Sequence, residues 1–159
     1  MKPPEIPAVS RAAAAKQVAA FIAKFDPKVA KVIRACRAEM RQLLPTAIEL
    51  VYDNYNFFVI GYATTERASD CIVSIAAAAN GVGLSFYYGA SLPDPTHILL
   101  GEGKQNRFIR LPTAAPLHAP EVLTLIQAAV ALAKTPLPKT AGGYTVIKSI
   151  SAKQRPRRK

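Results

Sequence analysis

The sequence predicts an α+β fold in a single domain, with helices packed on one face of a mainly antiparallel sheet. Three observations predict it. The N-terminal third shows helical periodicity, the middle of the chain is rich in Val, Ile, Tyr and Phe with hairpin signals, and a further helical segment follows the strands. A chain of 159 residues can bury one sizeable core. Half of its residues are hydrophobic and 19% are charged, which indicates a globular body.

Two helices are expected at the N-terminal end. Proline-rich residues 1–9 predict a flexible leader, and Ala-rich residues 10–25 favour a first helix. Asp26 followed by Pro27 is typical of an N-cap and a first helical position, so a second helix is expected over residues 27–44. Its apolar residues recur at helical spacing and predict a buried stripe: Val29, Val32, Ile33, Cys36, Met40, Leu43 and Leu44. Its polar side carries Lys28, Lys31, Arg34, Arg37 and Arg41.

The central part of the chain predicts strands. Residues 48–63 are rich in β-branched and aromatic residues and indicate one or two strands with a turn between them. Asn80 and Gly81 both tolerate positive φ, so they predict a hairpin turn between strands over residues 71–79 and 82–88.

A loop, a strand and a helix are expected next. Asp94 lies between two prolines and is expected to cap a short helical turn over residues 96–100. Residues 108–112 predict another strand, and Pro120 begins a helix that extends to about residue 133.

The composition changes after residue 134. We expect the α+β domain to span residues 10–134, followed over residues 135–159 by a linker, a short extended segment and a basic tail. Residues 144–150 indicate either a late strand or a docking arm, and residues 151–159 are expected to be disordered in isolation.

Charge is unevenly spread along the chain, whose net charge is +11 at pH 7. Residues 1–45 hold nine Lys and Arg against three Asp and Glu, residues 46–100 hold one against five, and residues 101–159 hold eleven against two. Both ends are therefore basic and the middle is acidic. This pattern favours an anionic ligand or macromolecule as partner, including nucleic acid contacted non-specifically through the basic tail. A solvated basic face is the alternative interpretation.

Several features predict a cytoplasmic protein with no membrane partner. The N-terminal end lacks the continuous apolar run of a signal peptide, and no stretch approaches the ~20 apolar residues of a membrane-spanning helix. Cys36 and Cys71 lie far apart without zinc-ligand spacing, which indicates reduced, buried thiols. We expect no cofactor.

A glycine-spaced turn that carries a lysine does not match the nucleotide-binding motifs. A P-loop needs a glycine five residues before Gly103 and a Ser or Thr after Lys104. Ile98 and Gln105 occupy those positions. A dinucleotide-binding fingerprint would need a third glycine and a helix, and a strand-like segment follows instead.

The same turn is nevertheless the candidate anion-binding site. The candidate residues are Gly101, Gly103, Lys104, Arg107 and Arg110. Lys and Arg beside a glycine turn are suitable donors to an anion. In a strand Arg107 and Arg110 point to opposite faces, so convergence of the cations requires a twist or a bulge. The alternative is a plain glycine turn with solvated cations.

Four acids in the middle of the chain are the alternative metal site, which would take a hard cation through oxygen ligands. They are Glu49, Asp53, Glu66 and Asp70. Glu49 and Asp53 lie four residues apart, roughly 13 Å along a strand, which is too far to share one ion without a bend. The alternative is that these acids are solvated or pair with the basic helix. The main interpretation therefore includes no metal.

No catalytic group can be named from the sequence. His97 and His118 are the only histidines, and the serines lack the Gly-x-Ser-x-Gly elbow. Five tyrosines form either a pocket or part of the core: Tyr52, Tyr55, Tyr62, Tyr87 and Tyr88. A binding protein is therefore favoured over an enzyme.

The order of these pieces resembles the YdhG-like family, which is catalogued largely as a domain of unknown function. The resemblance covers roughly residues 20–134 and rests on the helix ending in Leu43-Leu44-Pro45, on residues 49–53 and 80–84, on residues 100–111, and on the helix that follows. It implies an α+β domain with helices against an antiparallel sheet. Some relatives are described as frataxin-like iron chaperones, which use surface acids.

These observations lead to one main functional hypothesis and two alternatives. We expect a non-enzymatic binding protein that recognises an anionic ligand or partner through Lys104, Arg107 and Arg110, assisted by the basic helix and tail. The alternatives are non-specific association with nucleic acid and iron binding through the four acids.

Overall fold

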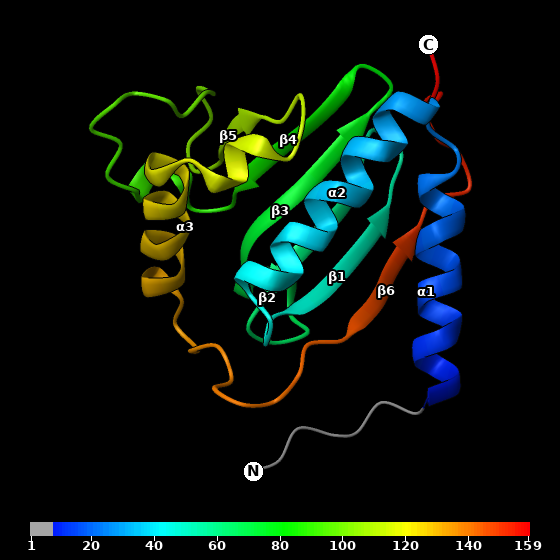
Figure 1. The fold of residues 1–159 in the computed structure, drawn as a ribbon, viewed down its shortest axis with the longest axis horizontal. Coiled ribbons are helices and arrows are strands. Elements are labelled where there is room, and N and C mark those ends of the chain that lie inside the picture. Colours follow the sequence, from blue (N-terminus) through cyan, green and yellow to red (C-terminus); the bar gives the residue numbers. More distant parts are fainter. Residues whose placement is uncertain (1–7) are drawn as a thin grey trace.

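The computed structural model describes the backbone of residues 8–159 and the side chains of residues 11–159. Within that range it contains three α-helices and six strands (Figure 1). The helices are α1 (Ala8–Ile22), α2 (Pro27–Leu43) and α3 (Pro120–Leu132). The strands are β1 (Ile48–Asp53), β2 (Phe58–Ala63), β3 (Cys71–Ala78), β4 (Gly81–Phe86), β5 (Arg107–Arg110) and β6 (Thr145–Ile150).

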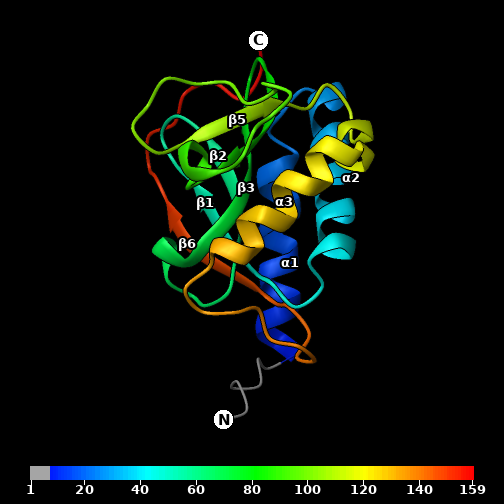
Figure 2. The same cartoon turned by 90° about the vertical axis from the view of Figure 1, so that its left-hand side faces the viewer.

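The strands form one mixed, mostly antiparallel sheet in the order β5-β4-β3-β2-β1-β6. Strands β1 to β5 pair antiparallel with their neighbours, and only β6 pairs parallel, with β1. All three helices lie on one side of the sheet (Figure 2). The predicted α+β class and single domain are therefore confirmed. We call the face turned away from the helices the open face.

The main core lies between the helices and the sheet. Helix α2 contributes Ile33, Cys36 and Met40, which are fully buried, as its periodicity predicts. Phe58 of β2 meets Phe21 and Phe25 at ring-centroid distances of 6.0 and 6.1 Å. A smaller apolar cluster covers the open face at the β1–β6 end: Ile48, Leu50, Ala63 and Cys71, with Tyr52, Tyr144 and Val146 packed against them.

The predicted element boundaries agree with the structure to within a few residues, with one exception. Helix α1 begins at Ala8, inside the expected leader, whose residues 1–7 lie outside the described range. The expected helical turn over residues 96–100 does not form. Asp94 instead accepts hydrogen bonds from the backbone N–H groups of Ile98 and Leu99, both at 3.0 Å, around His97, which has a φ of 54°.

The segment after residue 134 contributes a strand to the sheet. Strand β6 lies inside the sheet because it pairs with β1, so the late strand rather than the docking arm is found. Residues 151–159, which the sequence predicts to be disordered in isolation, lie against the segment between α1 and α2 and against the β1–β2 turn. The physical reason is the guanidinium of Arg157, which is 5% exposed and pairs with the fully buried carboxylate of Asp53.

Candidate binding site on the open sheet face

Small side chains form the floor of a hollow on the open face. Strands β3 and β4 turn five of them to this face: Ser74, Ala76, Ala78, Gly83 and Ser85. The sheet register places Ala76 opposite Gly83 and Ser74 opposite Ser85. The alternate residues of both strands are apolar and buried against the helices, and all of them except Ala77 are large. Two cross-strand rows of small residues therefore lie in the middle of a sheet whose other face is fully packed.

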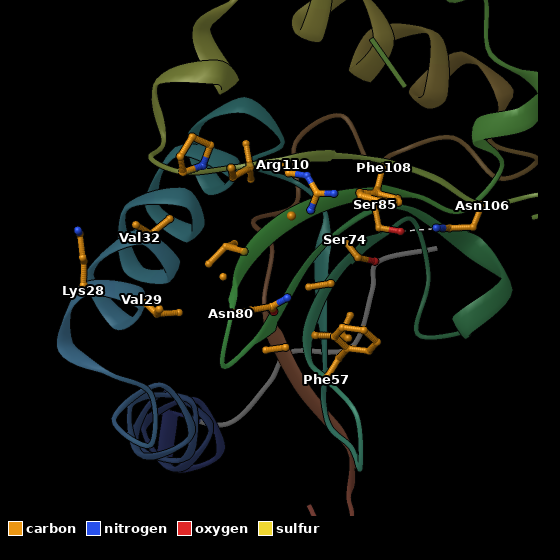
Figure 3. Close-up of a pocket in the computed structure, with 18 of the residues that line it drawn as sticks. Lys28, Val29, Val32, Phe57, Ser74, Asn80, Ser85, Asn106, Phe108 and Arg110 are labelled. Atoms are coloured by element: carbon orange, nitrogen blue, oxygen red, sulfur yellow. Dashed lines mark hydrogen bonds between the residues drawn. The ribbon is translucent and has the colours of Figure 1, made fainter. Parts of the chain in front are cut away.

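Larger side chains surround this floor, and together they enclose a hollow of about 760 Å³ that we call the basin (Figure 3). Phe108 and Arg110 stand at the β5 edge. Phe57, from the turn between β1 and β2, borders the opposite side and is 49% exposed. The volume falls in the range of about 300–1,000 Å³ that is usual for small-molecule sites.

The described residues that line the basin carry charge of one sign. Among residues 11–159, its only charged lining residues are Lys28 and Arg110, and no Asp or Glu of that range lines it. The guanidinium of Arg110 lies 5.8 Å from the centroid of the Phe108 ring. Beside them Ser85 donates to Oδ1 of Asn106 at 2.7 Å. Apolar surface next to cations is suited to a ligand that is itself apolar at one end and anionic at the other.

The basin extends past the tip of the β3–β4 hairpin to the first turns of α2. Asn80 and Gly81 form this tip, and the φ of 141° at Gly81 explains the glycine there. Lys28, Val29 and Val32 of α2 line the far end (Figure 3). The basic side of α2 thus contributes one cation to the basin.

The structure separates the five residues predicted to hold an anion. Arg107 pairs with Phe86 and turns to the helix side of the sheet, whereas Arg110 pairs with Gly83 and turns to the open face. Arg107 donates to two backbone carbonyls of its own loop, those of Gly103 and Asn106. Of the five, only Arg110 lines the basin.

The two glycines of this segment serve the loop. Leu100 and Phe108 exchange backbone hydrogen bonds of 2.8 and 3.0 Å, which closes residues 101–107 into a loop. Gly101 follows Leu100 with a φ of 112°, a conformation that residues with a Cβ rarely adopt. A Cβ at Gly103 would meet nothing within 4 Å, so that position does not require glycine for space.

Glu49 of the predicted acidic set is buried within an ion pair. Its carboxylate accepts two hydrogen bonds from Arg37, one from Tyr62 and one from Thr145. Burial by itself would raise the pKa of Glu49, but these donors and the charge of Arg37 hold it below its ordinary value. Burial and the neighbouring Glu49 carboxylate raise the pKa of Tyr62 well above its ordinary value.

The carboxylate of Asp53 also forms ion pairs. Lys24 lies 2.7 Å from Oδ2 and Arg157 lies 2.9 Å from Oδ1. Burial again opposes ionisation, and the hydrogen bonds from Lys24, Gln154 and Arg157 outweigh it, so the pKa of Asp53 is lowered. Glu49 therefore pairs with the basic helix through Arg37, as one interpretation of the acids expects, whereas Asp53 pairs with Lys24 and Arg157, which lie outside that helix.

Glu66 and Asp70 lie apart from this pair of carboxylates. Glu66 accepts from Tyr144 at 2.9 Å, and Asp70 accepts from Thr65 at 2.6 Å. Across residues 11–159, no three His, Cys, Asp or Glu side chains gather as a metal ion would require. The four acids thus occupy separate, hydrogen-bonded positions.

The remaining sequence candidates form no reactive group. His118 lies 3.3 Å from Glu39 at the surface. Both cysteines are buried, and burial raises the pKa of Cys36 to about 11 and that of Cys71 above its ordinary value. Low-pKa thiolates are the reactive ones, and neither cysteine has the lowered pKa that marks such a thiol.

Sequence reasoning missed the floor of the basin. The signal was present as small residues at alternate positions, 74, 76 and 78 before the hairpin turn and 81, 83 and 85 after it. The alternation places them on one face, and their small size leaves that face hollow.

Comparisons with protein-family models, with curated proteins and with solved structures each find no match for this chain. Among the described residues, no helix combines the length and apolar character needed to cross a membrane.

Proposed function

We propose that the protein binds a small organic anion with a flat apolar body, which lies on the open face of the sheet. The observation that carries this proposal is the basin: a floor of small side chains, with Arg110 and Lys28 as the only charged lining residues within the described part of the chain. The protein is proposed to act as a binding module, and the proposal keeps Arg110 of the predicted anion-binding residues.

Each feature of the proposed ligand matches a feature of the basin. Ala76 and Gly83 offer a flat surface that an apolar ring system can cover, and Phe57 and Phe108 provide aromatic walls. Arg110 offers a planar fork of N–H donors that suits a carboxylate, a sulfonate or a phosphate. Burying the apolar body stabilises the complex by about 25 cal/mol for each Å² removed from water.

The experiment uses two fluorescent probes that differ in charge. Anilinonaphthalene sulfonate has a flat apolar body and one anionic group, and N-phenylnaphthylamine is its uncharged counterpart. We expect saturable binding of the anionic probe with one site per chain. Arg110→Gln should weaken the anionic probe about tenfold, the effect of one charged hydrogen bond, and leave the neutral probe unchanged.

Matched variants separate the site from general charge and stability. Arg34→Gln removes the same charge from an exposed position of α2 outside the basin lining and should leave both probes unchanged. Ala76→Phe fills the floor and should weaken both probes, whereas Ala13→Leu enlarges an exposed alanine of α1 without effect. Equal loss with Arg110→Gln and Arg34→Gln would mean that net charge alone attracts the probe.

Exposed aromatic side chains favour a second candidate function, the binding of single-stranded nucleic acid. Tyr55, Phe57, Tyr87 and Tyr88 are between 39% and 49% exposed, and Phe57 and Tyr87 line the basin. Bases stack on aromatic rings displayed on sheets, and phosphates pair with Lys and Arg. A labelled oligonucleotide should then bind with an affinity that falls steeply as the salt concentration rises. The affinity should also fall in the Tyr87→Ala variant. Leu132→Ala, which changes an exposed residue of α3, is the control and should leave the affinity unchanged. Binding that is insensitive to salt would contradict this candidate.

A further inference from the structure

One buried arginine anchors the C-terminal tail, residues 151–159. No helix or strand follows Ile150, and most tail side chains are exposed. Arg157 is the one buried side chain among them, at 5% exposure. An extended segment that holds its site through one inserted side chain has the form of a short peptide motif in its docking groove.

The guanidinium of Arg157 finds acceptors for both terminal nitrogens, whereas its buried Nε has no partner among the described residues. It donates from Nη2 to Oδ1 of Asp53 at 2.9 Å and to the carbonyl of Asn54 at 2.6 Å, and from Nη1 to the carbonyl of Asn56 at 3.3 Å. The ring of Phe25 lies 5.8 Å from its central carbon. A planar fork satisfies these acceptors together, and a lysine ammonium has neither the fork nor the flat face.

Main-chain and side-chain hydrogen bonds hold the rest of the tail in an extended form. The N–H of Ser151 donates to the carbonyl of Asp53, and that of Arg155 donates to the carbonyl of Tyr55, both at 2.9 Å. The side chains of Gln154 and Arg158 donate to the carbonyls of Asp53 and Lys24 at 2.8 and 3.1 Å. The groove therefore supplies one buried side-chain pocket, which gives specificity, and backbone acceptors at its surface.

We propose that the groove around Asp53 is a docking site for an extended, arginine-containing peptide, and that the chain's own tail occupies it in cis. A partner that offers an arginine in an extended segment competes for the same pocket. Lys24, which pairs with the second carboxylate oxygen of Asp53 at 2.7 Å, keeps the carboxylate ionised and oriented for either occupant. This site is separate from the basin, and its proposal does not depend on the function proposed there.

The test supplies the tail in trans to the full-length chain. The variant Arg157→Ala keeps the length of the tail and its other eight residues but empties the pocket. A labelled peptide with the sequence of residues 151–159 should bind this variant saturably, at physiological salt, at least tenfold more tightly than it binds the unmodified chain, whose pocket is filled. A peptide with Lys in place of its Arg157 equivalent should bind at least tenfold more weakly.

The strongly basic net charge of the protein opposes unspecific attraction of a basic peptide, which makes the result easier to interpret. If the alanine variant does not fold, Arg157→Lys keeps a cation beside Asp53 and replaces it in the same titration. A folded variant that takes up no peptide would overturn the proposal. Equal binding of the arginine and lysine peptides would also overturn it, because the site would then read charge alone.

Discussion

Arg37 of α2 donates two hydrogen bonds to the buried carboxylate of Glu49 on β1, from Nε to Oε2 at 3.1 Å and from Nη2 to Oε1 at 2.9 Å. The pair joins the helical layer to the sheet at a point where the carboxylate has almost no contact with water. Tyr62 and Thr145 complete the set of donors, so the carboxylate connects α2, β1, β2 and β6.

The first prediction follows from this pair. Glu49→Gln leaves the half-buried guanidinium of Arg37 without its counter-charge, and breaking a buried pair on one side destabilises proteins by about 3–5 kcal/mol. Urea unfolding should register a loss of that order in the free energy of unfolding. Glu102→Gln, which changes an exposed loop residue, should stay within about 0.5 kcal/mol. A change of the same small size for both variants would show that the pair does not hold the layers together.

The second prediction concerns acid. The pKa values of Glu49 and Asp53 are lowered in the folded protein, so their ionised forms stabilise it. This contribution is complete above their unfolded-state pKa of about 4 and is lost as the pH falls through the folded-state pKa. The free energy of unfolding should therefore drop steeply below about pH 4, and the drop should be smaller in Glu49→Gln. Identical acid profiles for the two proteins would contradict the assignment.

The third prediction uses two adjacent glycines in the segment before β6. A Cβ on Gly143 would collide with the backbone carbonyl of Ala47, whereas a Cβ on Gly142 would meet nothing within 4 Å. Gly143→Ala should therefore destabilise the protein by about 1–3 kcal/mol, the usual effect of overpacking. Gly142→Ala should be neutral or slightly stabilising. Thermal unfolding of the two variants measures the contrast, and equal midpoints would mean that β6 does not dock as described.

The fourth prediction concerns the thiols. Because the pKa of Cys36 is about 11 and that of Cys71 is raised, only a minute fraction of either is thiolate near neutral pH. A chromogenic disulfide reagent should label the native protein slowly and both cysteines rapidly once urea unfolds it. Rapid labelling of either thiol in the native state would show that its burial is incomplete.

Local patterns in the sequence predicted most of the fold. The Asp26-Pro27 start of α2, the Asn80-Gly81 hairpin and the start of α3 at Pro120 each depend on residues close in sequence, and all appear in the structure. The place of β6 depends on its pairing with β1, which precedes it by more than 90 residues, and the place of the tail depends on a contact between residues 104 positions apart, Asp53 and Arg157. No local pattern encodes such a contact, and so the basic tail resembled a disordered one.

In the candidate site, too, the sequence predicts the features that depend on nearby residues and not those that depend on how the layers pack. The sequence singled out Arg110 through the charge of its segment, and the structure turns it toward the open face. The floor at Ser74 and Ala76 depends on which face of the sheet the helices cover, which composition does not specify. The acids were visible in the sequence, but their partners Arg37 and Lys24 become apparent only when the two layers meet.

The most direct test of the central claim maps the anionic probe onto the protein residue by residue. Amide correlation spectra of isotope-labelled protein, recorded during a titration with anilinonaphthalene sulfonate, should show saturable shifts clustered at Ser74, Ala76, Gly83, Ser85 and Arg110. The Arg110→Gln variant should need about tenfold more probe to reach the same shifts. Shifts confined to the helical face, or the absence of saturable shifts at the basin, would contradict the account.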